Sequence, residues 1–120
     1  DVDGQYGKVR LQHCLGVAFV DGSIYVADTY NNKIKQIDPQ AQTCKTIAGG
    51  QADANAAAAF DEPAGISAAG RRLFIADTNN HLIRVIDLDR ENKVGTLTIE
   101  GLEAPVVKTT QPKVKESDEE

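Results

Sequence analysis

The stretch IYVADTYNNKIKQID (residues 24–38) aligns without a gap on LFIADTNNHLIRVID (residues 73–87), with seven identities in fifteen positions. Residue frequencies alone give roughly one identity over that length. The same offset of 49 residues extends backwards along the chain, where Gly16 meets Gly65. The chain therefore contains two copies of one structural unit, and this repeat decides the fold.

Each copy has the periodicity of short β-strands. Apolar residues do not recur at the i, i+3, i+4, i+7 spacing of an amphipathic helix. Turn residues separate the apolar runs, as at Asp21 and Gly22, at Asn31 and Asn32, and at Asp38 before a proline. About 40 residues with four strands is the length of a propeller blade. The expected strands are residues 15–20, 23–28, 33–38 and 43–48 in the first copy and 64–68, 72–77, 82–87 and 94–99 in the second.

The sequence thus predicts an all-β fold made of two four-stranded antiparallel blades of a β-propeller, followed by a disordered tail. Stacked repeats need about three units to close a core, so two blades leave apolar faces uncovered. We expect further blades on the same polypeptide, or further copies of the chain, to complete a ring of six blades. The expected boundaries are an inter-blade loop from a preceding blade (1–10), the first blade (11–50), an inter-blade loop (51–59), the second blade (60–101) and a flexible acidic tail or linker (102–120).

Charge and hydropathy narrow the classes of partner. The formal net charge is −5, which works against binding to a phosphate backbone, so nucleic acid is not an expected partner. The longest apolar run, residues 56–60, is far shorter than the about 18 residues that a membrane-spanning helix needs. No transmembrane segment is expected.

The cysteines and histidines give no pattern of a redox or metal site. Cys14 and Cys44 lie thirty positions apart without a C-x-x-C motif, and the only histidines, His13 and His81, occupy non-equivalent positions in the repeat. We expect two small buried or half-buried thiols rather than a disulfide. We expect no catalytic residue, no metal and no cofactor.

The most similar part of the two copies, A-D-T-x-N, has the chemistry of a turn. The aspartates are expected to accept backbone N–H groups across the hairpin, and Asn31 and Asn80 to adopt the left-handed conformation. Two carboxylates on different blades do not make an oxygen cage for a metal ion. The glycines open each first strand near the propeller axis, where a side chain would be crowded. Structural roles are thus predicted for Asp28, Asp77, Gly16 and Gly65.

These residues resemble the NHL repeat, whose blades run L-x-x-P-x-G-I, then A-D-[ST]-x-N-[NH]-x-I-[KR], then an aspartate and a strand that closes with T-L-A-G. The resemblance covers residues 11–101. The first copy has Cys14 where the family usually has proline. The order of loop, blade and tail is also similar to the C-terminal propeller blades of NHL proteins that carry a thioredoxin-like domain. In the second copy the motif positions are occupied by Phe60, Pro63, Gly65, Ile66, Ala76, Asp77, Thr78, Asn80, Ile83, Arg84 and Asp87.

The resemblance implies a non-catalytic scaffold that binds a protein partner and belongs to a larger multidomain protein. Any redox chemistry would then lie in the thioredoxin-like domain. That group has members in the chloroplast thylakoid lumen and in the cytosol, so the resemblance leaves the localisation open. NHL propellers present loops on one face of a disc. The loop residues expected to face a partner are Tyr30, Asn31, Asn32, Lys33, Asn79, Asn80, His81 and Leu82.

Tyr30 is the best candidate for an anchor, because an exposed aromatic side chain offers a large contact area with little entropy to lose. The same loops also fit ordinary hairpin tips without a partner. An RNA-binding propeller is a second alternative, although the first copy is neutral and the second acidic. A third is a lyase-type propeller with histidine-bound zinc, whose metal site would lie outside this stretch.

Overall fold

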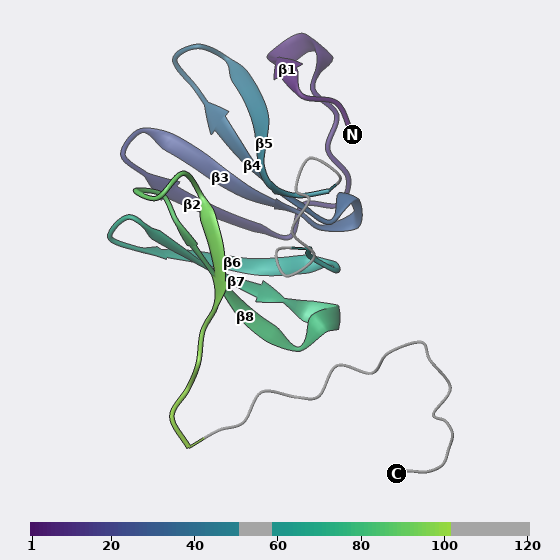
Figure 1. Ribbon diagram of the computed structural model, residues 1–120. Helices are drawn as coiled ribbons and strands as arrows, with labels where there is room; N and C mark the ends of the chain where they lie inside the picture. The colour runs from purple at the N-terminus through teal and green to yellow at the C-terminus, as the bar shows by residue number, and fades with distance from the viewer. Residues whose placement is uncertain (51–58, 102–120) are drawn as a thin grey trace, which may run out of the picture.

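Two antiparallel sheets, stacked on each other, form the part of the chain that the structure describes (Figure 1). This computed structural model describes residues 1–50 and 59–101. The strand order is β1-β5-β4-β3-β2 in the first sheet and β6-β7-β8-β9 in the second. The prediction of an all-β fold with two propeller blades is confirmed. The expectations for the loop at 51–58 and for the tail at 102–120 lie outside the described residues.

All eight expected strands are present. The strands of the first blade are β2 (Gly16–Val20), β3 (Ser23–Asp28), β4 (Lys33–Asp38) and β5 (Thr43–Gly49). Those of the second blade are β6 (Pro63–Ala69), β7 (Arg72–Asp77), β8 (Leu82–Asp87) and β9 (Lys93–Thr96). β9 ends before the expected residue 99, but the Leu97 N–H still donates to the Ile83 carbonyl at 2.8 Å. Short 3₁₀ turns add η1 (Tyr6–Lys8), η2 (Thr29–Asn31) and η4 (Thr78–Asn80).

A ninth strand, β1 (Gly4–Gln5), was not expected. It pairs antiparallel with β5, with Gly4 opposite Cys44, and widens the first blade to five strands. The Asp3 carboxylate fastens this segment, because its Oδ2 accepts the Thr46 N–H at 2.9 Å and the Thr46 hydroxyl at 2.8 Å. Residues 1–10 were expected to be a loop, since a two-residue strand leaves no alternation to detect.

The turn between β2 and β3 has the predicted chemistry. Asp21 and Gly22 both have positive φ, 49° and 86°, as in a two-residue hairpin turn of the primed type. The turn sets the register in which Val20 faces Ser23. The hairpin prediction at this position is confirmed.

The hydrophobic core lies between the two sheets, where β2 packs against β6. The first blade contributes Val20, Tyr25, Ala27, Ile34 and Ala48, and the second contributes Leu73, Ile75 and Ile86, with Phe60 beside them. These side chains come from one face of each sheet, as the alternation of side chains along a strand requires. Only one face of each blade is therefore covered by the other.

Gly16 permits the close approach of the two blades. A Cβ at this position would lie 2.1 Å from the Ala64 carbonyl oxygen and 2.8 Å from Ile66 Cγ2. Both distances are shorter than atoms tolerate, so any side chain would push β2 and β6 apart. At the equivalent Gly65 the nearest described atom is Ala76 Cβ, 3.7 Å away, which is an ordinary contact.

Candidate functional site

The turns η2 and η4 lie at the same end of the two blades (Figure 1). A buried aspartate precedes each turn. In the first blade the Asp28 side chain is fully buried. Its Oδ1 accepts the Gln12 backbone N–H at 2.7 Å, and its Oδ2 accepts an Asn31 Nδ2–H at 2.9 Å. The Tyr30 N–H donates back to the Gln12 carbonyl at 3.2 Å. The carboxylate thereby ties the turn to the segment that precedes the first strand.

The second blade repeats the arrangement. Asp77 is also fully buried, and its Oδ1 accepts the Asp61 N–H at 2.8 Å, while its Oδ2 accepts an Asn80 Nδ2–H at 2.9 Å. The Asn79 N–H donates to the Asp61 carbonyl at 3.0 Å. We call this arrangement the aspartate staple of each blade. The sequence had suggested that the backbone donor lies across the hairpin of the second and third strands. In the structure the donor instead precedes the first strand.

The left-handed residue of each turn is not the asparagine that was predicted. Asn31 and Asn80 belong to the 3₁₀ turns, whereas the next residues, Asn32 and His81, have φ of 59° and 58°. Asparagine and histidine are among the non-glycine residues enriched in this region. The asparagine amide is held by the aspartate, so the chain reverses one residue later. The prediction for Asn31 and Asn80 was therefore wrong.

The Tyr30 side chain is exposed at this end, with 51% of its surface accessible. Its ring packs on the His13 ring with centroids 4.3 Å apart and planes tilted by 33°. His13 has a φ of 55°, which turns the chain just before β2. No sequence pattern predicted this pair, because residues 13 and 30 meet only in the folded chain.

Several of the predicted partner-binding residues already make contacts within the chain. The Asn32 side-chain oxygen accepts the Glu62 N–H at 2.8 Å and so links the two blades. Lys33 forms an ion pair with Asp1. The Asn79 side-chain amide donates to Asp61 Oδ1 at 3.1 Å.

Leu82 is half-buried, whereas His81 is exposed at the tip of the second turn. Asn31 and Asn80 belong to the aspartate staples. Four of the eight predicted residues are exposed: Tyr30, Asn32, Asn79 and His81. The side chains of Asn32 and Asn79 are engaged in hydrogen bonds within the chain.

A basic residue follows each staple on the third strand of the blade. In the second blade the Arg84 Nε donates to Asp77 Oδ2 at 3.0 Å, and Arg84 NH2 donates to the Ala59 carbonyl at 3.3 Å. The guanidinium also lies 5.9 Å from the centre of the Phe60 ring. In the first blade the equivalent Lys35 is buried and pairs with Asp1 and Asp3. Arg84 thus holds the turn of its own blade, whereas Lys35 holds the segment around β1.

Neither cysteine has the lowered pKa that is typical of a reactive thiol. Both are free thiols in the structure. Cys14 Sγ donates to Asp28 Oδ1 at 3.8 Å. Partial desolvation, with the Asp28 charge beside it, raises the pKa of the Cys14 thiol to about 11, and desolvation also raises the pKa of Cys44. Both sulfurs are therefore protonated at neutral pH, and the thiolate is the reactive form.

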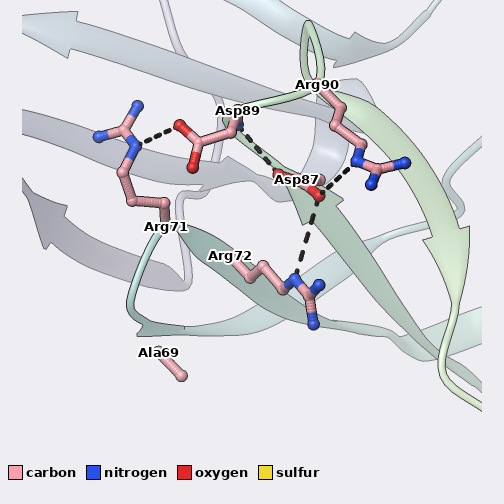
Figure 2. A pocket seen from close by; sticks show the side chains of 6 residues that line it. All are labelled: Ala69, Arg71, Arg72, Asp87, Asp89 and Arg90. Carbon is pink, nitrogen blue, oxygen red and sulfur yellow. Dashed lines mark hydrogen bonds and ion pairs between the residues drawn. The ribbon is translucent and has the colours of Figure 1, made fainter.

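The opposite end of the second blade holds an open hollow of about 390 Å³, shown in Figure 2. Its arginines are matched by aspartates: Arg71 lies 2.7 Å from Asp89 and 2.5 Å from Asp21 of the first blade. Hydrogen bonds to these two carboxylates raise the pKa of Arg71. The hollow thus contains a network of ion pairs that connects the blades. Its lining residues are Ala69, Arg71, Arg72, Asp87, Asp89 and Arg90.

Two further searches of the described residues concern metals and membranes. Residues 1–50 and 59–101 contain no group of three or more His, Cys, Asp or Glu side chains placed to hold a metal ion. No helix in these same ranges combines the length and the apolar composition needed to cross a bilayer.

The paired blades and their repeated aspartate staples define the chain as part of a β-propeller repeat protein. The model of the family described as NHL repeat matches residues 11–37 and 60–86, one stretch in each blade. The chain therefore carries two NHL repeats. The match covers the segment before the first strand and the first three strands of each blade, and so includes both staples.

The chain is similar to several curated proteins but spans only a small part of each. It is 44% identical over 117 residues to Protein SUPPRESSOR OF QUENCHING 1, chloroplastic, of Arabidopsis thaliana, which is 90% of this chain and 11% of that protein. It is 44% identical to NHL repeat-containing protein 2 of Bos taurus and 43% identical to that of Homo sapiens, each over 99 residues. Those matches cover 74% of this chain and 14% of each relative.

Among solved structures, the chain is similar to an auxiliary nutrient binding protein from Bacteroides thetaiotaomicron. The TM-score is 0.48 and the sequence identity 22%, over 79% of this chain and 25% of that chain. A likeness at this level carries no information on function.

Proposed function

We propose that this chain is a non-catalytic protein-binding module of a larger multidomain protein. Its binding edge is the end of the blades that carries the turns η2 and η4, with His13, Tyr30 and His81 as the contacting side chains. The observation that carries the proposal is the exposed Tyr30 ring, packed on His13 in the turn η2.

General features of protein recognition support Tyr30 as the main contacting side chain. Tyrosine is enriched among the residues that dominate binding energy, since its ring buries a large area and its hydroxyl keeps a hydrogen-bonding group. The Asp28 staple holds the backbone of the turn, and His13 supports one side of the ring. A side chain that is ordered before binding loses less entropy when a partner covers it.

The larger protein context follows from the relatives. The chain spans 11% of the plant relative and 14% of the animal relatives, so other segments would supply any chemistry of a whole protein of this kind. In this proposal the two blades contribute a binding surface, and a thioredoxin-like domain elsewhere in such a protein would contribute the redox function. Neither an RNA-binding nor a lyase function has a supporting observation among the described residues.

A peptide-display selection tests the edge directly. Peptides selected on the wild-type chain are measured by calorimetry against Tyr30→Ala, Tyr30→Phe and Arg90→Ala. The Arg90 side chain is 75% exposed and lies at the opposite end of the blades, so it is the matched control. We expect Tyr30→Ala to weaken binding about tenfold or more, and Arg90→Ala to leave it unchanged.

Tyr30→Phe separates the ring from the hydroxyl, because it retains the contact area. Equal affinity of the wild-type and Tyr30→Ala chains for every selected peptide would refute the binding edge. A single-stranded RNA oligonucleotide serves as a second probe, and binding to it that weakens steeply with salt would favour the RNA-binding alternative instead.

A further inference from the structure

Two exposed acidic residues, Asp61 and Glu62, connect the turns η2 and η4 of the binding edge. The Glu62 N–H donates to the side-chain oxygen of Asn32, the residue directly after η2, at 2.8 Å. Asp61 Oδ1 accepts the side-chain amide of Asn79 at 3.1 Å, and Asn79 has in η4 the position that Tyr30 has in η2. The binding edge therefore carries two acidic groups beside the turn with the exposed aromatic ring.

The carboxylates of Asp61 and Glu62 form no ion pair with any lysine or arginine of residues 1–50 and 59–101. The basic side chains that follow the two turns have other acidic partners, since Lys33 pairs with Asp1 and Arg84 pairs with Asp77. The formal net charge of the chain is −5, which has the same sign. A surface of this kind attracts cationic partners and repels anionic ones.

The Tyr30 ring supplies the second element of a site for a cation. His13 packs against the ring with centroids 4.3 Å apart, and 51% of the tyrosine surface remains accessible. The face of an aromatic ring attracts a lysine or arginine cation that lies within about 6 Å of its centre. The turns lie at the ends of the strands, not on the faces where one blade stacks on another (Figure 1). Stacking of further blades therefore leaves the ring open.

The same combination of groups already holds a cation inside the chain. The Arg84 guanidinium donates to Asp77 Oδ2 at 3.0 Å and lies 5.9 Å from the centre of the Phe60 ring. An aromatic ring and a carboxylate thus share one arginine in the second blade. At the binding edge a ring and two carboxylates are present, and the cation would come from a partner.

We propose that the binding edge selects a cationic peptide segment, whose lysine or arginine side chain docks on the Tyr30 ring beside the carboxylates of Asp61 and Glu62. This inference rests on the proposed function and adds the chemical class of the partner. Among the described residues, the charge of the edge favours a basic peptide over an acidic one and over a nucleic acid.

The composition of selected peptides is the first test. Peptides from a random display library, selected on the wild-type chain, are expected to be enriched in lysine and arginine over the unselected library. The lead peptide is then compared with an analogue in which arginine is replaced by citrulline, or lysine by norleucine, so that the charge is removed and the length retained. We expect the analogue to bind about fivefold more weakly or worse.

Two variants with the same change of charge locate the effect on the protein. Glu62→Gln is expected to weaken binding of the lead peptide about two- to fivefold. Glu91→Gln is the matched control, because Glu91 is also exposed and has a similar φ, but lies in the turn between β8 and β9 at the opposite end of the blades. Fluorescence anisotropy should show no change for this control. The loss caused by citrulline should be smaller on Glu62→Gln and on Tyr30→Ala than on the wild-type chain.

The outcomes separate this inference from the proposed function. Peptides that bind in a Tyr30-dependent way, but are not enriched in lysine or arginine and tolerate citrulline, would overturn the inference and leave the binding edge intact. Equal losses for Glu62→Gln and Glu91→Gln would show diffuse attraction to an acidic chain, and would also overturn it. Selected peptides whose binding is independent of Tyr30 would refute both proposals.

Discussion

Equivalent positions of the two blades carry similar residues but differ in burial. Ile34 is fully buried, whereas Ile83, its equivalent, is 38% exposed. The difference is reversed on the other face, where Leu73 is fully buried and the equivalent Ile24 is only half-buried. In each pair the buried residue faces the other blade. The neighbouring blade therefore decides whether a residue of this repeat belongs to the core.

The staples show a second difference between the blades. Lys35 and Arg84 are equivalent and both buried, but the lysine amino group lies 2.6 Å from Asp1 and 2.5 Å from Asp3, while the arginine pairs with the staple aspartate. Lysine carries its charge on a flexible stem, whereas the planar guanidinium of arginine presents several fixed donors. The first blade thus uses its cation to hold β1, and the second uses it to hold its own turn.

The largest predicted effect compares the two staples. Asp77→Ala removes two hydrogen bonds and the ion pair with Arg84, and we expect a loss of about 3–5 kcal/mol in the free energy of unfolding. Asp28→Ala removes hydrogen bonds alone and should cost about 1–3 kcal/mol. Urea denaturation of both variants at one protein concentration measures the difference. Equal losses would show that the buried ion pair adds nothing to the second staple.

A smaller effect distinguishes the two glycines. Gly16→Ala places a Cβ 2.1 Å from a backbone oxygen of the other blade and should destabilise the chain by about 1–3 kcal/mol. Gly65→Ala meets only an ordinary contact and should change the unfolding free energy of a single chain by about 0.5 kcal/mol or less. Urea denaturation of both variants at one low protein concentration measures the two changes in unfolding free energy. A Gly65→Ala variant as unstable as Gly16→Ala would mean that the blades do not differ in this way.

The smallest effect concerns the contact that only the first blade shows among the described residues. Burial raises the pKa of Asp3, but hydrogen bonds from Lys35 and Thr46 outweigh it and bring the pKa below its ordinary value of 3.8. A lowered folded pKa stabilises the chain above the unfolded pKa, and this stabilisation is lost as the pH falls from about 4 through the folded value.

Because the Asp3 side chain is 37% exposed, we expect a contribution of about 1 kcal/mol or less. Denaturation as a function of pH, with Asp3→Asn as the control, measures it. The asparagine variant should lose this part of the acid dependence and be less stable than the wild-type chain at neutral pH. An identical pH profile for the two chains would contradict the assigned role of Asp3.

The repeat, the blade strands and the turn at Asp21 and Gly22 were determined by the sequence alone. These features depend on the alternation of side chains and on the conformations that individual residues permit, both of which act over a few neighbouring positions. The repeat also located both staple aspartates. Each of these predictions was supported twice, because the two copies carry similar residues at equivalent positions.

The contacts between distant residues were decided only by the tertiary structure. The staple joins Asp28 to Gln12, the stack joins Tyr30 to His13, and Lys35 reaches Asp1. No local pattern specifies such pairs, because they form when one strand or segment is laid beside another. The exposure of one apolar face of a blade is likewise decided by packing, because the two blades have similar sequences although a different face of each is covered. Burial is a property of that packing, and it differs between two copies of the same unit.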